Sequence, residues 1–376
     1  MISTENENKI PSLRRNITVK DIRNQLSHDR GFAFIFHVTS WDTLRVFFNN
    51  MPDKDEIEAR VLWNTPPFIG SAIYENNNVI GANIVMPVPI ELWINSPNMI
   101  KQLRHRQFFP ALQLARQCGL SIAALGGSTP YICNYGKLDR PFKIPYITTG
   151  HAATAAALKK WAILACERTQ LEFSDIRLAI FGAAGRLGKA VSRYIAHGRL
   201  PREIILIDLP NNINLLKKLA AEIRQHNGYM NIKVSTHGIV KEKPLPSFDG
   251  AILVSNNTVP YLTAEDLRKA HFWIDDSHPR AASIEAEESA RHETLYIECY
   301  LSGPDGLNTD TNFNLPSTND CYTCFAEGYI AWKEQITEDY ITGIPNITAI
   351  ENVALALEKY QFNTGPFFGK GGVVLT

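Results

Sequence analysis

The chain has 376 residues, of which 45% are hydrophobic and 20% are charged, a composition typical of globular rather than disordered proteins. Its 38 Lys and Arg balance its 38 Asp and Glu, so no net field favours nucleic acid or an anionic membrane surface. Single domains usually stop growing between about 100 and 250 residues, and we therefore expect two domains.

Six cysteines without regular spacing favour a reducing compartment, so the expected location is cytoplasmic. The opening, residues 1–12, is polar and lacks the apolar core of a signal peptide. No later stretch is apolar over the roughly 18 residues that a membrane span needs, which predicts no integral membrane segment. We expect an N-terminal tail at 1–30.

The first predicted domain, residues 31–150, is an α/β substrate domain. In chain order we expect a buried strand at 32–38, a helix from about 41, a hairpin at 71–84, a helix at 98–118 and a strand at 120–125.

A polar turn, Gly126, Gly127 and Ser128, follows the last of these strands. Open α/β sheets place ligands at the carboxyl ends of their strands, so the turn is a candidate substrate site, although such turns also occur without a ligand.

Residues 148–167 are Ala-rich and apolar at helical spacing, which predicts a helix linking the domains.

The second predicted domain, residues 151–316, alternates strands and helices, a pattern that favours a Rossmann-like, doubly wound parallel sheet. The last segment, 317–376, is expected to form C-terminal helices that pack back on the cleft. The predicted elements are strands at 177–182, 203–208, 250–254 and 272–275, and helices at 186–197, 212–226, 263–270, 318–336 and 346–360.

A dinucleotide-binding fingerprint begins the second domain, where an apolar run leads into Gly182, Gly185 and Gly188 and then into a helix. Such glycines permit a tight turn, a close approach to pyrophosphate and close helix–strand packing. The spacing GxxGxxG differs from GxGxxG, but the strand and helix context supports the motif. The residues assigned to the cofactor are Gly182, Ala183, Ala184, Gly185, Arg186, Leu187 and Gly188.

Asp208 ends the second strand of this domain, 20 residues after Gly188, where a carboxylate would bind the adenosine ribose. A carboxylate there would repel a 2′-phosphate, and no Arg or Lys follows directly. NAD(H) is therefore favoured over NADP(H).

Cys324 is a candidate nucleophile. It is expected in the first turns of a helix that opens with capping residues near Ser317, where the positive helix end lowers a thiol pKa. Gly328 shares its face and would leave room for an adduct, although a lone cysteine is usually a small buried hydrophobe. Cys321 completes CxxC on the same expected face, so a reversible disulfide is a hypothesis. A zinc site would need a second ligand pair, so we predict no metal.

Five segments occur together and in order: SIAALGGSTPYI at 121–132, ITTGHAAT at 147–154, GAAGRLGKAV at 182–191, WIDDSHPRAA at 273–282 and TCFAEGYIAW at 323–332. This set resembles the long-chain acyl-acyl carrier protein reductases, soluble enzymes that form fatty aldehydes. With FIFHVTSWDTLR at 34–45 and LWNTPP at 62–67, the likeness covers residues 31–362.

The resemblance implies reduction of an acyl thioester, carried by acyl carrier protein or CoA, through a covalent cysteinyl thioester. The family's cysteine falls on Cys324. The resemblance also assigns Thr148 and Thr149 to cofactor binding, in a loop that would face the nicotinamide and the acyl group. The family's Phe is Ser128 here and its Asn is His151. Family members generally prefer NADPH, which keeps NADP(H) as the other candidate cofactor.

His151 is the best-placed proton donor of three histidines in these segments, which also include His37 and His278, because imidazole titrates near neutral pH. Two other functions stay open. One is direct hydride transfer, as in dehydrogenases of the shikimate or amino-acid type, for which Cys324 would be dispensable. The other is a nucleotide-binding protein without catalysis.

Overall fold

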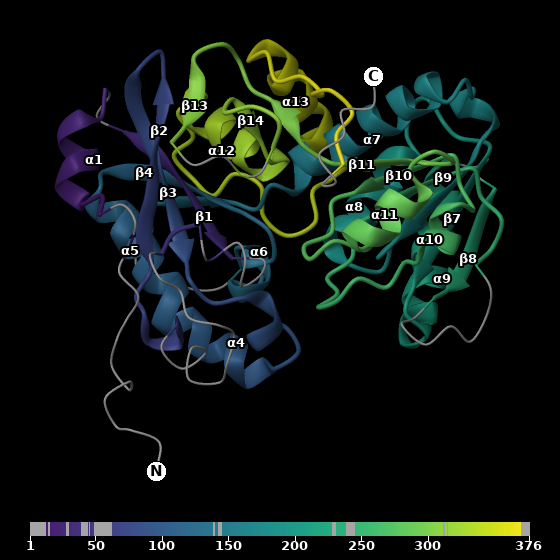
Figure 1. Ribbon diagram of the computed structural model, residues 1–376, viewed down its shortest axis with the longest axis horizontal. Coiled ribbons are helices and arrows are strands. Elements are labelled where there is room, and N and C mark those ends of the chain that lie inside the picture. The colour runs from purple at the N-terminus through teal and green to yellow at the C-terminus, as the bar shows by residue number, and fades with distance from the viewer. Residues whose placement is uncertain are drawn as a thin grey trace. The chain divides into compact units, whose positions relative to one another are not determined.

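The computed structural model describes residues 13, 16–27, 30–38, 44, 46–48, 62–137, 140–141, 145–227, 231–237, 245–310, 313 and 315–369. The chain forms two compact units (Figure 1). The first comprises 1–150 and 303–343, and the second 151–302 and 344–376. The helix predicted from about 41 begins outside the described residues.

The first unit is built on a six-stranded sheet with the order β13-β2-β3-β1-β4-β5. Strands β3, β1, β4 and β5 are parallel, whereas β2 runs antiparallel to β3 and to β13. The predicted hairpin is therefore confirmed as β2 and β3. The strands are β1 (Gly31–His37), β2 (Phe68–Glu75), β3 (Asn78–Met86), β4 (Leu120–Leu125), β5 (Tyr146–Thr148) and β13 (Leu307–Thr309).

Strand β1 is buried on both faces, which explains its continuous apolar sequence. Because side chains alternate along a strand, Phe32 and Phe34 face one side and Ala33 and Ile35 the other. The rings of Phe32 and Phe34 lie 5.2 and 5.5 Å from that of Phe325 on α12 (Thr323–Lys333). Ala33 and Ile35 instead join the core beneath α5 (Phe109–Gln117).

The helix predicted at 98–118 is present in three pieces: α4 (Pro97–Leu103), a π-helical stretch (Arg104–Phe108) and α5. Pro110 has no N–H to donate to the preceding turn, which accounts for the change of helical winding before α5. The apolar side chains along this helical segment are buried: Ile100, Leu103, Phe108, Leu112 and Ala115.

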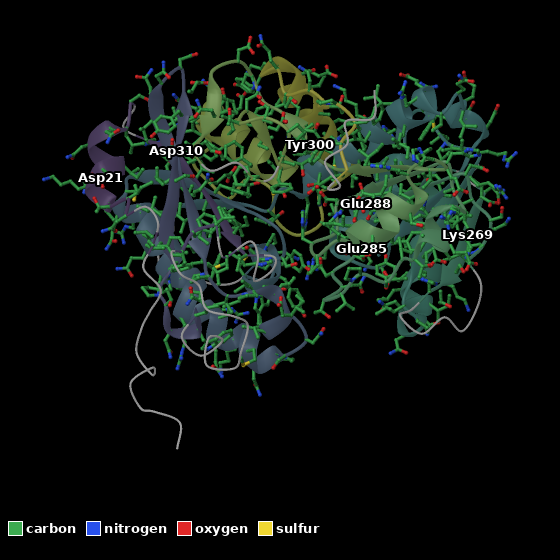
Figure 2. The ribbon with its side chains drawn as sticks, in the orientation of Figure 1. Asp21, Lys269, Glu285, Glu288, Tyr300 and Asp310 are labelled. Atoms are coloured by element: carbon green, nitrogen blue, oxygen red, sulfur yellow. The ribbon has the colours of Figure 1, made fainter. Side chains whose placement is uncertain are left out.

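Part of the expected N-terminal tail is a helix, α1 (Val19–Gln25). Thr18 accepts a hydrogen bond from the Asp21 N–H, and the Asp21 carboxylate accepts one from the Thr18 N–H (Figure 2 labels Asp21). This capping box starts the helix, and Ile22 enters the first core. The prediction of a tail over all of 1–30 is therefore wrong for these residues.

The second unit contains a six-stranded parallel sheet with the order β11-β10-β9-β6-β7-β8. Numbered within the unit, this is the 3-2-1-4-5-6 order of the doubly wound dinucleotide-binding fold, which confirms the predicted fold class. The strands are β6 (Arg177–Phe181), β7 (Glu203–Asp208), β8 (Ile232–Thr236), β9 (Gly250–Leu253), β10 (Phe272–Asp275) and β11 (Leu295–Glu298).

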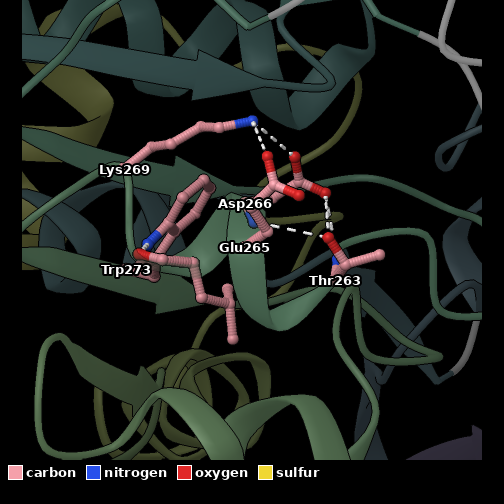
Figure 3. Close-up of polar contacts among 6 residues, drawn as sticks. Thr263, Glu265, Asp266, Lys269 and Trp273 are labelled. Atoms are coloured by element: carbon pink, nitrogen blue, oxygen red, sulfur yellow. Dashed lines mark hydrogen bonds and ion pairs between the residues drawn. The ribbon is translucent and has the colours of Figure 1, made fainter.

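Side-chain hydrogen bonds hold one helix of this unit, α10 (Ala264–Leu267), beside the sheet. In α10, Thr263 and Asp266 form a capping box, and the Trp273 indole N–H donates to the Leu267 carbonyl over 2.8 Å (Figure 3). That bond ties α10 to β10. The other α-helices of the unit are α7 (His151–Arg168), α8 (Arg186–Ile195), α9 (Ile213–Asn227), α11 (Ile284–Ala290) and α13 (Ile347–Lys359).

The C-terminal segment, expected as one part, divides between the units: α12 belongs to the first and α13 to the second. Helix α12 begins at Thr323, and its N-cap, Tyr322, makes no side-chain cap bond. The expected capping at Ser317 is wrong, because the Ser317 N–H donates to Asp320 in a local turn instead.

The remaining short elements belong to both units. They are α6 (Thr129–Ile132), β12 (Leu301–Ser302), β14 (Asp320–Cys321) and 3-10 turns at Ile90–Leu92, Phe173–Asp175 and Pro210–Asn212.

No helix within the described ranges combines the length and apolar character that crossing a bilayer requires.

Candidate functional site

The glycine turn lies between β6 and α8. Gly182 has φ of +79°, and an added Cβ would lie 2.6 Å from the Val254 carbonyl oxygen. At Gly188 a Cβ would lie 2.1 Å from the Gly182 oxygen, so this glycine permits close packing of helix and strand. Gly185 is different, because the nearest atom to an added Cβ is 3.1 Å away. The three glycines therefore have the three distinct environments that a pyrophosphate-binding turn requires.

Asp208 lies at the carboxyl end of β7 and is bonded to the glycine turn. Its carboxylate accepts hydrogen bonds from the Ala184 N–H at 2.8 Å, the Leu209 N–H at 2.8 Å and the Asn212 amide at 2.7 Å. A carboxylate has about four acceptor positions, so capacity for a ribose hydroxyl remains. The structure thus brings the predicted turn and the predicted acidic residue together.

A pocket of about 290 Å³ lies at the carboxyl ends of β6, β7 and β9, where doubly wound folds hold their ligands. Its volume and its mixed lining of apolar and polar side chains suit part of a dinucleotide, and the glycine turn forms one wall. Sequence reasoning missed the residues after β8 and β9, which carry no glycine motif. The pocket is lined by Phe181, Gly182, Ala184, Gly185, Ile207, Asp208, Leu209, Asn212, His237, Val254, Ser255, Asn256, Asn257 and Tyr261.

Hydroxyl groups after β9 form a small network beside this pocket. The Ser255 hydroxyl lies 3.1 Å from that of Ser277 and 3.3 Å from that of Tyr261, and it accepts from the Asn257 amide at 3.0 Å. Burial raises the pKa of Tyr261, so its hydroxyl stays protonated and can donate at neutral pH.

Asp275 is the last residue of β10 and Asp276 follows it, also at the carboxyl edge of the second sheet. Asp275 accepts hydrogen bonds from the Ser277 N–H at 2.8 Å and the Ala281 N–H at 3.0 Å in the following turn, and from the hydroxyl of Tyr296 on β11. Burial, followed by the negative charges of Asp275 and Glu298, raises the pKa of Asp276 well above its usual value. Asp276 is therefore an acid that holds its proton in the range where an ordinary carboxyl loses it.

The first unit has its own cluster at the carboxyl ends of β1, β4 and β5. The turn at Gly126, Gly127 and Ser128 lies against His37: an added Cβ at Gly127 would be 3.0 Å from His37 Nε2. The Ser128 N–H donates to that nitrogen over 2.9 Å, while His37 Nδ1 donates to the Val38 carbonyl over 2.8 Å. Both ring nitrogens have backbone partners, which fixes a neutral tautomer and gives His37 a structural role.

Burial lowers the pKa of His37 to about 4. An unfolded chain has a His pKa near 6.5, so between these values the unfolded state binds a proton that the folded state does not. We expect the free energy of unfolding to fall by about 3 kcal/mol from this group as pH drops from about 6.5 to about 4. A His37→Gln protein should lose this part of the pH dependence in denaturant titrations at pH 7 and pH 4.5. Equal pH slopes in parent and variant would contradict the expectation.

Cys324 lies in the first turn of α12 and is the only one of the six cysteines that is not fully buried. The backbone of Gly150 lies directly against it: a Cβ at Gly150, where φ is +79°, would be 2.2 Å from Cys324 Cβ. A Cβ at Gly328 would be 2.3 Å from that of Ala124. The small residues on this helix face therefore allow close contact with β4, and the expected room for an adduct at Gly328 is filled.

Glu327 is fully buried one turn after Cys324, and sequence reasoning missed it. Its Oε1 accepts hydrogen bonds from the Thr148 hydroxyl and, over 2.8 Å, from the Gly150 N–H. The carboxylate thus joins α12 to the end of β5 and fixes the loop that lies against the Cβ and backbone of Cys324. The sequence did contain a signal for Glu327: it lies three residues after Cys324, a spacing that places the two side chains next to each other on one face of a helix.

Three other predicted residues are also located. Cys321 lies in β14 and not on the helix, so the argument that it shares a helical face with Cys324 is wrong; burial, and next the Cys324 charge, raise its pKa well above the usual value. His151 is the buried first residue of α7 and belongs to the second unit. Thr149 belongs to the first unit, with Thr148, whereas the glycine turn belongs to the second.

Among the described residues, no group of three or more His, Cys, Asp or Glu side chains is arranged to hold a metal ion.

Neither a protein-family model nor a curated protein matches the sequence. Among solved structures, the L-tryptophan dehydrogenase of Nostoc punctiforme is similar at 12% identity, with 88% of this chain and 81% of that chain covered and a TM-score of 0.38. The quinate dehydrogenase of Corynebacterium glutamicum, solved with NAD, is similar at 11% identity, with 88% and 100% covered and a TM-score of 0.37. Shikimate 5-dehydrogenase of Listeria monocytogenes is 10% identical, with 90% and 93% covered and a TM-score of 0.30.

Proposed function

We propose that the protein is a nicotinamide-dependent oxidoreductase that reduces an acyl thioester, carried by acyl carrier protein or CoA, to an aldehyde. The nicotinamide part of the proposal is supported by the glycine turn, Asp208 and the adjoining pocket. The thioester part is supported by one observation above all, the half-buried Cys324 in the first turn of α12 against Gly150.

The residues around the pocket fit a dinucleotide. Gly185 is the N-cap residue of α8 and lines the pocket, so the backbone N–H groups and the dipole of this helix end would attract a pyrophosphate there. Asp208 would accept a ribose hydroxyl. A bound reduced nicotinamide would supply a hydride to the acyl carbonyl carbon; Cys324 Sγ would then leave that carbon as the thiolate, and the aldehyde would be released.

Cys324 would act before that hydride is used. Its thiolate attacks the carbonyl carbon of the thioester, a bond forms between Sγ and the acyl group, and the bond to the carrier sulfur breaks. The leaving carrier thiolate takes up the proton that Cys324 gave up. The position of Cys324 in the first turn of an eleven-residue helix favours the thiolate form. His151 is proposed as the group that holds the exchanged proton.

The decisive experiment is turnover with a panel of acyl-CoA and acyl carrier protein thioesters plus NADH or NADPH, with aldehyde measured by mass spectrometry. Aldehyde formation that consumes one reduced nucleotide per aldehyde supports the proposal. Nucleotide binding without aldehyde from any thioester would remove the proposed activity and leave the nucleotide-binding protein as the remaining function.

Direct hydride transfer without a covalent intermediate is the second candidate. It is supported by Asp276, a carboxyl with a raised pKa at the carboxyl end of β10, which could exchange the proton that accompanies hydride transfer. This reaction would use hydroxy or amino acids as substrates. Oxidation of such substrates with NAD or NADP, undiminished in a Cys324→Ala protein, would favour it.

Asp208 supports NAD(H) as the cofactor, because its negative charge would lie beside any 2′-phosphate. We expect NADH to bind more tightly than NADPH by calorimetry. Asp208→Asn keeps an oxygen that can accept from the Ala184 N–H but removes the charge, so the ratio of the two affinities should change about tenfold in favour of NADPH, or about 1.4 kcal/mol. NADPH binding as tight as NADH binding in the parent protein would show that Asp208 does not select the cofactor.

A further inference from the structure

Three hydroxyl groups in the first unit are buried but lack a hydrogen-bond partner among the described residues: those of Ser128, Thr129 and Thr149. Their residues are 4%, 0% and 2% exposed. The neighbouring Thr148 hydroxyl differs, because it donates to Glu327. Buried hydroxyls in folded proteins nearly always have a partner, so three without one in a single region require an explanation.

The hydroxyls come from one edge of the sheet. Strands β4 and β5 are parallel neighbours, with Ala124 opposite Thr148. Parallel neighbours lie about 4.8 Å apart, so the segments that follow them leave the sheet side by side. Thr149 follows β5 directly, while Ser128 and Thr129 lie in the turn after β4 and at the start of α6.

The same edge carries Cys324. Gly150, the residue after Thr149, is in contact with Cys324 Cβ, and Gly328 on the next turn of α12 lies against Ala124 of β4. Helix α12 therefore packs on the face of the sheet, with its first turns beside the ends of the two strands that present the hydroxyls. The thiol and the unpartnered hydroxyls belong to one unit and one cluster of elements.

Glu327 holds this arrangement in place. It binds the residues on both sides of Thr149, namely the Thr148 hydroxyl and the Gly150 N–H. The Thr149 N–H donates to the Ile341 carbonyl at 2.9 Å. The backbone around Thr149 is thus fixed at three consecutive residues, while its hydroxyl is left available.

We propose that the hydroxyls of Ser128, Thr129 and Thr149 bind the carbonyl oxygen of the acyl group that Cys324 takes up. The inference rests on the proposed function, which it extends from the nucleophile to the binding site of the reacting carbonyl. A carbonyl oxygen is an acceptor, and hydroxyls supply donors without adding charge. When Sγ attacks, that oxygen becomes an oxyanion with three lone pairs, and donors already in place stabilise it more than the ground state. Thr149 is thereby assigned to the acyl group and not to the cofactor.

The test is the rate at which Cys324 is acylated by palmitoyl-CoA or octanoyl-CoA without nucleotide, followed by intact-protein mass spectrometry. We expect Thr149→Val, Ser128→Ala and Thr129→Val each to slow acylation by about 10- to 100-fold. Thr149→Ser keeps the hydroxyl and should retain the rate of the parent protein.

Thermal stability provides the second readout. Removing a buried hydroxyl that has no partner should leave Tm unchanged or raise it, so slow acylation should accompany an intact Tm. The matched control is Thr294→Val in the second unit, whose buried hydroxyl donates to the Ala270 carbonyl at 2.6 Å. This control should lower Tm and leave the acylation rate unchanged.

The outcomes separate the inference from the function on which it rests. Acylation of the three hydroxyl variants at the parental rate, in a parent protein that does acylate Cys324, would overturn the carbonyl site alone. Absence of any acyl adduct on the parent protein would overturn both. A drop in Tm for Thr149→Val as large as that for Thr294→Val would show that the hydroxyl has a structural partner and would also overturn the inference.

Discussion

Replacing Cys324 by alanine should reduce aldehyde formation by about 1,000-fold or more, because removal of a covalent nucleophile leaves only binding and electrostatic contributions to the rate. In the parent protein, thioester without reduced nucleotide should add the mass of one acyl group. The adduct should be sensitive to hydroxylamine, should disappear when NADH or NADPH is added, and should be absent from the variant.

Cys321→Ala is the matched control, since Cys321 is fully buried in β14 and its raised pKa keeps it a thiol. It should acylate and turn over as the parent protein does. A Cys324→Ala protein that makes aldehyde at the parental rate would exclude covalent catalysis and leave direct hydride transfer as the better proposal.

Replacing Gly185 by valine should weaken dinucleotide binding by about 100-fold while lowering Tm less than Gly188→Ala does. The reason is that the first added atom would lie 3.1 Å from the Gly182 oxygen, a tight contact that a small shift of the turn relieves, whereas the pyrophosphate needs the space itself. Calorimetric titration with NADH and a thermal melt of the same sample measure the two effects.

Gly188→Ala is the contrasting variant. Its Cβ would lie 2.1 Å from the Gly182 oxygen, so helix α8 and β6 would have to separate, at a cost of about 1–3 kcal/mol in the free energy of unfolding. We expect a lower Tm for the Gly188→Ala protein.

The Gly185→Val protein provides the outcome that would contradict this cofactor site. If it folds and binds NADH as tightly as the parent protein does, the pyrophosphate does not bind at the glycine turn.

Much of the second unit could be predicted from sequence, because its signals are local. The strands at 203–208 and 272–275 have the predicted bounds, and each predicted strand of the unit overlaps an observed one. The helix predicted at 263–270 is shorter, α10 ending at Leu267. The turn between β6 and α8 was recognisable because the glycines reflect backbone conformation, which depends on the residues themselves.

Parts of the first unit could not be predicted from sequence, because they depend on contacts between distant segments. Strand β4 was predicted with its observed bounds, yet β13, which adds to the same sheet beside β2, was not predicted at all. Leu307 pairs with Glu75, more than 200 residues earlier, and nothing in three residues of β13 encodes that partner. The capping predicted near Ser317 failed for a related reason: its backbone bonds to Asp320, so the helix starts later.

By itself the sequence determined the alternation of strands and helices, the glycine turn with Asp208, and Cys324 as the nucleophile candidate, because propensity, spacing and turn chemistry act between near neighbours. Only the tertiary structure decided what surrounds that thiol. Thr148 and Glu327 are 179 residues apart, and their hydrogen bond exists because α12 packs on the sheet with its first turns beside the ends of β4 and β5. Whether a buried hydroxyl has a partner, as at Thr148, or lacks one among the described residues, as at Thr149, follows from packing between distant segments and not from the identity of the residue.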